Sequence, residues 1–138
     1  MYMVKRQLKL SMLKSICYFL KTGRIMSKLE GIKEILAEDD LMGLIKIGAP
    51  EDEYDSEAEH LSMVITHHSS IKFIQECLWN VFYNSFCHIT YTKKVKGKFT
   101  EIGSRFMPKD RAVKMIGTIS RYRKTAAKLR KFLKNQAP

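Results

Sequence analysis

The sequence predicts a mainly α-helical fold, a small helical bundle of about four to five helices with a short β-hairpin near residues 89–102. Three observations lead to this prediction. Apolar residues recur at helical spacing along most of the chain, most clearly in residues 70–86. Helix-start signals precede several of these stretches, among them Ser27 followed three residues later by Glu30. The spacing changes to alternation in residues 89–102, on either side of Gly97.

The N-terminal half is expected to form helices separated by one loop. Residues 6–21 form a basic amphipathic helix that either docks on the core or lies against a membrane surface or a partner. A capping box at Ser27 begins the next helix, and residues 41–50 form a glycine-containing loop. Pro50 is predicted to begin a further helix, with carboxylates in its first turn, where the helix dipole favours them. The buried stripe of that helix consists of Tyr54, Ala58, Leu61, Ile65 and His68.

The C-terminal half is expected to hold the central helix, the hairpin and one long basic helix. Residues 70–86, capped by Ser69 or Ser70, are apolar around most of the circumference, so neighbours should bury this helix on most sides. Gly97 supplies the turn of the hairpin. A single helix then runs from Pro108 to about Asn135.

Composition places the chain among ordinary globular proteins. Its 138 residues are 45% hydrophobic and 28% charged, which suffices to bury one core. Three cysteines without close pairing indicate free thiols in a reducing cytoplasm, and no apolar run approaches the length of a transmembrane segment. Common phosphate-binding, dinucleotide-binding and serine-nucleophile motifs are absent, and Glu57 and His60 lack the second Glu-x-x-His pair of a di-iron site. We therefore expect a cytoplasmic protein that is not an enzyme and uses no metal or cofactor.

Charge divides the chain into three blocks. Nine of the fourteen acidic residues lie between Glu38 and Glu59, whereas both flanks are basic and the whole chain carries a net charge of +11. This pattern suggests a basic N-terminal extension (1–25), a helical core domain (26–88), and a basic hairpin with a C-terminal helix (89–138). Met26, directly before the capping box, is an alternative start of the chain.

Three segments carry a resemblance to a known family: IKEILAEDDLMGL (32–44), GAPEDEYDSEAEHL (48–61) and SSIKFIQECLWNVFYNSF (69–86). Pro50 to Asp55 read Pro-Glu-Asp-Glu-Tyr-Asp, and Asp40 and Gly43 stand in the preceding loop. With these motifs, residues 29–88 resemble the YugE-like proteins, small bacterial helical domains of unknown function. The resemblance covers somewhat under half of the chain and implies a compact helical bundle. Some relatives occur beside bacterial toxins, which implies an immunity-type or inhibitory role.

The acidic block predicts a docking surface for a basic protein partner. Complementary charges steer such partners together and set the register of their interface. The residues predicted to bind the partner are Asp39, Asp40, Glu51, Asp52, Glu53, Tyr54 and Asp55. A non-enzymatic protein–protein interaction module is therefore the leading functional hypothesis.

The basic C-terminal helix supports an alternative hypothesis, nucleic-acid binding. Between Lys109 and Lys134 ten basic residues stand against one acidic residue, Asp110. Such a surface neutralises phosphates, and Tyr122 is predicted to stack on a base. The predicted nucleic-acid-binding residues are Arg111, Lys114, Arg121, Tyr122, Arg123, Lys124, Lys128, Arg130 and Lys131. A lysine-rich face that is only solvated, or that pairs with the acids of residues 38–59, would explain the same pattern.

Overall fold

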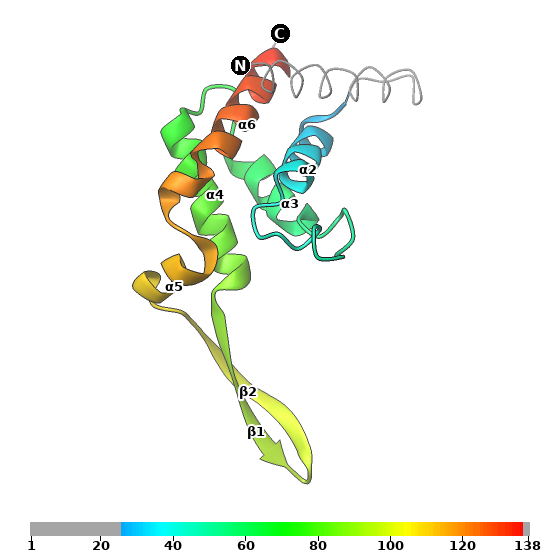
Figure 1. Cartoon of the computed structure of the whole chain (residues 1–138), viewed down its shortest axis with the longest axis vertical. Helices are drawn as coiled ribbons and strands as arrows, with labels where there is room; N and C mark the ends of the chain where they lie inside the picture. Colours follow the sequence, from blue (N-terminus) through cyan, green and yellow to red (C-terminus); the bar gives the residue numbers. More distant parts are fainter. Residues whose placement is uncertain (1–25, 137–138) are drawn as a thin grey trace.

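A computed structural model describes residues 26–136 (Figure 1). The predicted fold class is confirmed: these residues are mainly helical and include one two-stranded antiparallel hairpin. The predicted helix over residues 6–21 lies outside the described residues. The elements are α2 (Lys28–Asp39), α3 (Asp55–Val64), α4 (Ile71–Phe86), β1 (His88–Val95), β2 (Lys98–Phe106), α5 (Lys109–Ile116), the 3₁₀ helix η1 (Ile119–Tyr122) and α6 (Arg123–Gln136). Within residues 26–136, no helix combines the length and hydrophobicity needed to span a membrane.

Helix α2 begins at the predicted capping box. The Ser27 hydroxyl accepts a hydrogen bond from the Glu30 N–H at 3.2 Å, and the Glu30 carboxylate accepts one from the Ser27 N–H at 3.0 Å. The helix ends at Asp40, whose backbone is left-handed with φ 44°. In the first turn of the helix, Gly31 allows α6 to come very close, because a Cβ at this position would lie 1.9 Å from Cζ of Phe132. Packing between helices therefore explains this glycine.

Helix α3 begins later than the sequence predicts. The prediction that Pro50 starts the helix is wrong, because residues 51–54 form turns. In these turns each N–H donates to the carbonyl three residues earlier, from Glu53 to Pro50 and from Asp55 to Asp52. Tyr54 is the residue before the first helical turn, and its side chain points into the core. The predicted burial of His68 is also wrong: the helix ends at Val64, and His68 is exposed in the turn that follows.

Helix α4 contributes most to the core, as predicted. Ser70 caps it by accepting a hydrogen bond from the Phe73 N–H at 3.1 Å. Phe82 is fully buried, and its ring lies 5.8 Å from that of Tyr54 and 5.7 Å from that of Tyr122. Burial is less complete than expected, since Phe73 remains 45% exposed.

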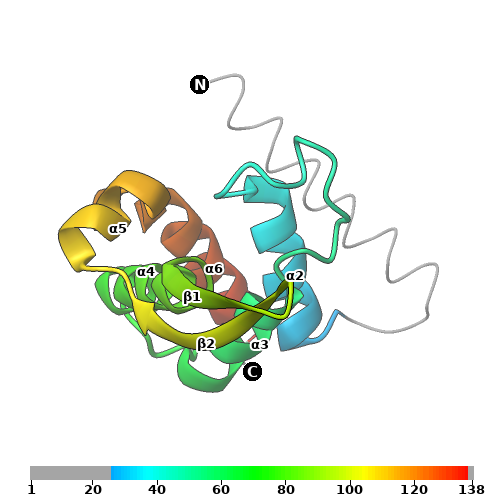
Figure 2. The same ribbon diagram turned by 90° about the horizontal axis from the view of Figure 1, so that it is seen from below.

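Residues on both sides of residue 88 share one apolar core. Helix α6 packs against α2 and α4 and buries Ala126, Leu129 and Leu133. Figure 2, seen from below, shows α4, α5 and α6 together and α2 opposite them. The predicted division at residue 88 follows the charge pattern, whereas the core crosses it.

The prediction of a single C-terminal helix from Pro108 to Asn135 is wrong. Gly117, with φ 85°, ends α5, and η1 and α6 follow in a new direction. Two aromatic side chains bind the carbonyl groups at this break: Trp79 donates to the Gly117 carbonyl at 3.0 Å, and Tyr122 donates to the Ile116 carbonyl at 2.6 Å. The apolar stripe continues across Gly117, so periodicity alone does not reveal the interruption.

The predicted hairpin is confirmed and is longer than expected. Lys96 and Gly97, both with positive φ, form its two-residue turn, the geometry that fits the twist of paired strands. The register shifts between Tyr91 and Thr92, so that Ile102 in β2 has no partner opposite it. The hairpin projects away from the helices, as Figure 1 shows.

Candidate functional site

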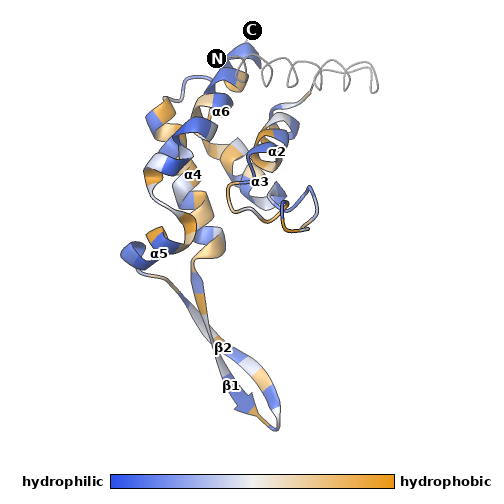
Figure 3. Ribbon diagram, in the orientation of Figure 1, coloured by the Kyte–Doolittle hydropathy of each residue, from blue (hydrophilic) through white to orange (hydrophobic). Residues whose placement is uncertain are grey.

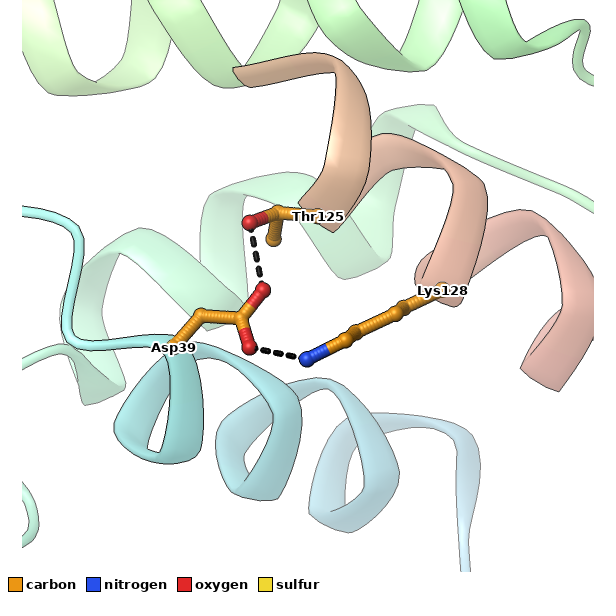
Figure 4. A network of polar contacts seen from close by, with 3 residues as sticks. All are labelled: Asp39, Thr125 and Lys128. Carbon is orange, nitrogen blue, oxygen red and sulfur yellow. Dashed lines mark hydrogen bonds and ion pairs between the residues drawn. The ribbon is translucent and has the colours of Figure 1, made fainter. Parts of the chain in front are cut away.

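Asp39 belongs to an internal polar network between α2 and α6 (Figure 4). One carboxylate oxygen accepts a hydrogen bond from the Thr125 hydroxyl at 2.6 Å, and the other pairs with the Lys128 ammonium. Thr125 is buried, and Asp39 stands in the last turn of α2, where the helix dipole disfavours a carboxylate. Lys128 and Thr125 offset this cost. Asp39 therefore makes internal contacts and does not belong to the predicted acidic surface. Lys128, which pairs with it, is only partly available on the basic surface.

Asp40 and Tyr54 close the loop between α2 and α3. The Tyr54 hydroxyl donates to the Asp40 carboxylate at 2.5 Å and accepts from the Met42 N–H at 3.2 Å. The same carboxylate accepts from the N–H groups of Ile45, at 3.1 Å, and Lys46, at 2.9 Å. Tyr54 is only 1% exposed. Both residues therefore have structural roles, and the prediction that Tyr54 contacts a partner is wrong.

These contacts shift both pKa values. Burial alone would raise the pKa of Asp40, but the hydrogen bonds from Tyr54 and from the loop N–H groups lower it overall. Burial, together with the Asp40 carboxylate, raises the pKa of Tyr54 to about 12. At neutral pH the pair is a carboxylate bound by a neutral phenol.

Several of the remaining acidic side chains line an open depression beside α2 and α3. Glu51, Asp52 and Glu53 are exposed in the turns before α3, and Asp55 pairs with Lys33 at 3.3 Å. The depression has a volume of about 390 Å³. Its acidic lining consists of Glu34, Glu38, Glu51, Asp52 and Asp55. Of the seven predicted partner-binding residues, Glu51, Asp52 and Glu53 are the ones freely presented to solvent.

Helix α6 separates apolar and basic residues cleanly. Its buried side carries Thr125, Ala126, Leu129 and Leu133, and it contains no acidic residue. Its exposed side carries Arg123, Lys124 and Lys131, with the half-exposed Lys128 beside them. Lys124, Lys128 and Lys131 stand at spacings that place them on one helical face. Figure 3 shows hydrophilic residues along the length of α6.

Helix α5 presents a second set of basic residues. Ala112 and Ile116 are buried, whereas Lys109, Arg111 and Lys114 are exposed. Exposed basic side chains thus lie on two helices, α5 and α6, instead of on the one long helix that the sequence predicts.

The other predicted nucleic-acid-binding residues are buried, half-buried or bonded internally. Tyr122 is fully buried against Phe82, so the prediction that it stacks on a base is wrong. Arg121 donates to the Leu41 carbonyl at 2.5 Å, and Arg130 is half-buried. Part of the basic segment therefore binds the acidic segment internally, which was one of the alternative interpretations. Five of the nine residues remain exposed without such contacts to the described chain: Arg111, Lys114, Arg123, Lys124 and Lys131.

The hairpin adds basic residues that the sequence-based site did not include. Lys93, Lys94, Lys96 and Lys98 are all exposed, and Arg105 lies near the base of β2. The segment KKVKGK (93–98) was a visible signal, because it holds four lysines around the turn. Figure 3 shows hydrophilic and hydrophobic residues interleaved along this hairpin.

Groups suited to covalent or metal chemistry do not converge within residues 26–136. Burial raises the pKa of the Cys77 and Cys87 thiols, which makes both poor nucleophiles. Glu57 is buried while His60, one turn later, is exposed. The described residues contain no group of three or more potential metal ligands.

Comparison with protein families, with curated proteins and with solved structures found no match. The resemblance of residues 29–88 to the YugE-like proteins therefore stays a prediction.

Proposed function

We propose that this protein binds nucleic acid, without catalysis, through the exposed basic residues of α5 and α6. The observation that carries this proposal is the exposure of basic side chains on both helices. Arg111, Lys114, Arg123, Lys124 and Lys131 face solvent there, and Asp110 is the one acidic residue from Lys109 to Gln136. A surface of this kind attracts a polyanion and displaces its condensed counterions.

The chemistry of this surface favours phosphate contacts over base recognition. Lysine ammonium groups bind phosphates as point charges, and arginine forks do so through paired hydrogen bonds. The aromatic residue of this segment predicted to stack on bases, Tyr122, is buried. We therefore expect the α5–α6 surface to bind with little dependence on base sequence. A cytoplasmic location, which gives access to nucleic acid in a bacterial cell, forms part of this proposal.

The test replaces two exposed lysines of α6. In Lys124→Ala/Lys131→Ala, we expect the slope of log affinity against log salt on duplex DNA to fall by about 1.8, because each phosphate contact contributes about 0.9. The matched control is Lys46→Ala/Lys72→Ala, which removes the same charge from exposed positions outside this surface. An unchanged slope in the α6 variant, or an equal change in the control, would refute the proposed site.

The depression beside α3 supports a second candidate function, docking of a basic protein. Five carboxylates line it, against one lysine, Lys33. This function matches the immunity-like or inhibitory role implied by the family resemblance. Reversing Glu51 and Asp52 to lysine should abolish capture of a basic partner without lowering the melting temperature, since both side chains are exposed. Equal capture of the same partner by the reversed and unaltered chains would exclude this surface.

A further inference from the structure

The hairpin stands free of the helical body except at its base. There, the Phe106 ring stacks on Tyr83 at 5.5 Å, and the Tyr83 hydroxyl donates to the Met107 carbonyl at 2.5 Å. The Met107 N–H in turn donates to the Cys87 carbonyl at 2.8 Å. These contacts fix the direction of the two strands where they leave α4. Beyond them, the strands are exposed on both faces apart from the half-buried Ile89.

The free part of the hairpin exposes apolar side chains as well as charge. Phe99 is 74% exposed and Ile102 is 64% exposed. Within the hairpin, the Lys94 ammonium lies 5.8 Å from the centre of the Phe99 ring. Neither Phe99 nor Ile102 belongs to the apolar core of the helices. Tyr91 and Val95 of the same hairpin are exposed as well. Exposed apolar side chains that gather in one region and are rimmed by charged residues are typical of a binding surface.

The strand register distributes positive charge over both faces and the tip. Val95 pairs with Lys98, Lys94 with Phe99, and Lys93 with Thr100. Paired residues share a face and successive residues alternate, so Lys93 and Lys98 lie on one face and Lys94 on the other. Lys96 is in the turn. One acidic residue, Glu101, accompanies these lysines.

The presence of lysines on both faces of the hairpin distinguishes between the kinds of partner that it could bind. A sheet that stacks the bases of a single strand uses one face, and so does a sheet lying on an acidic protein surface. A ribbon inside a groove has a phosphate wall on each side. The major groove of B-DNA, about 12 Å wide, admits a two-stranded ribbon, and its thymine methyl groups offer contact to an apolar side chain such as that of Phe99.

We propose that the hairpin is an arm that enters the major groove of double-stranded DNA. Lysines on its two faces bind phosphates on opposite walls of the groove. Phe99, which shares a face with Lys94 and lies close to the turn, contacts base edges where the tip reaches the floor of the groove. This proposal rests on the nucleic-acid binding proposed for α5 and α6, and it specifies double-stranded DNA as the ligand. Helix α5 follows the hairpin after two residues and lies at its base (Figure 1). In this proposal its exposed Arg111 and Lys114 bind the DNA backbone beside the same groove.

The test measures binding of the full chain to a duplex of about 20 base pairs, the same duplex with glucosylated hydroxymethylcytosine, and the corresponding single strand and RNA duplex. The sugar fills the major groove and leaves the backbone charge unchanged. We expect the modified duplex to bind about tenfold more weakly, and the single strand and RNA duplex to bind more weakly than DNA duplex. Equal binding of the modified duplex, or stronger binding of single strand or RNA duplex, would overturn the major-groove arm.

Two hairpin variants complete the experiment. Lys93→Ala/Lys94→Ala/Lys98→Ala should lower the salt slope by about 2.7. Phe99→Ala should weaken duplex binding about tenfold at an unchanged slope, since it removes apolar contact and no charge. If neither hairpin variant alters binding while Lys124→Ala/Lys131→Ala does, the arm is refuted and the α5–α6 surface stands. If the unaltered chain binds none of the nucleic acids, both proposals fail.

Discussion

Asp40 and Tyr54 hold the loop between α2 and α3 in place. The sequence predicts both of them as residues of a partner-binding surface. Tyr54→Phe removes the hydroxyl that donates to Asp40 and accepts from the loop, and should lower the free energy of unfolding by roughly 1–3 kcal/mol at pH 7. Urea unfolding measures this difference. Because Phe retains the ring and its packing on Phe82, a loss of more than about 5 kcal/mol would contradict a role limited to hydrogen bonding.

The stability loss in Tyr54→Phe should depend on pH, because both Asp40 and Tyr54 titrate. The pKa of Asp40 lies below its ordinary value of 3.8, so its contribution is complete above about pH 4 and is lost as the pH falls through the lowered value. The pKa of Tyr54 rises from 10.0 to about 12, so its contribution is complete below pH 10 and declines between pH 10 and 12. The stability difference between the unaltered chain and Tyr54→Phe should therefore narrow at both extremes. A difference constant from pH 3 to pH 12 would contradict the pairing.

Asp39 couples stability to the proposed binding surface. Asp39→Asn removes the carboxylate that pairs with Lys128, which shares a helical face with Lys124 and Lys131. We expect the free energy of unfolding to fall by roughly 1–3 kcal/mol, while duplex DNA binds more tightly and the salt slope steepens by about 0.9. Denaturant titration and fluorescence anisotropy give the two readings. Weaker DNA binding by a folded variant would show that Lys128 does not belong to the surface.

At the scale of the elements, Gly117 determines where the C-terminal helices separate. A residue with a Cβ is strained at φ 85°, and that Cβ would lie 2.7 Å from Cδ of Arg121. Gly117→Ala should lower the free energy of unfolding by about 1–2 kcal/mol. Gly103→Ala in the hairpin is the control, because no atom lies within 4 Å of its Cβ position. Equal effects of the two substitutions on thermal unfolding would argue against strain at Gly117.

The hairpin is expected to be dispensable for folding of the helices. Replacing residues 89–105 by Asn-Gly joins His88 and Phe106, which already pair across the strands. The apolar core contains no residue from the replaced segment, so the melting temperature should stay within about 4 °C of the unaltered protein. Calorimetry tests this, with helical content as the control. A much lower melting temperature would give the hairpin a structural role and remove the reason to regard it as a free arm.

Elements set by local chemistry were predictable from sequence, and elements set by distant contacts were not. The capping box at Ser27 and the turn at Gly97 depend on neighbouring residues, and the sequence located both. The late start of α3 depends on Tyr54 reaching Asp40, fourteen positions away in the chain. Likewise, nothing near Asp39 indicates Thr125 and Lys128, which lie 86 and 89 positions later. Local patterns therefore identified the charged segments of the chain. They could not show which charged side chains bond to other parts of the same protein.

Opposite charges occupy different regions of the molecule around one core. The acidic depression lies beside α2 and α3, whereas exposed basic residues follow α6, α5 and the hairpin. The contacts Asp39–Lys128 and Arg121–Leu41 join the acidic and basic segments without neutralising the basic surface. Long-range attraction of a polyanion would thus orient the molecule with its hairpin and C-terminal helices toward the ligand.

The most direct test of this account is the binding of the full chain to mixed-sequence duplex DNA between about 50 and 200 mM salt. We expect tight binding at low salt and a linear fall of log affinity with log salt. The slope should correspond to several phosphate contacts at about 0.9 each. Absence of binding at the lowest salt, or an affinity that does not change with salt, would contradict the assignment of the basic surface to nucleic acid.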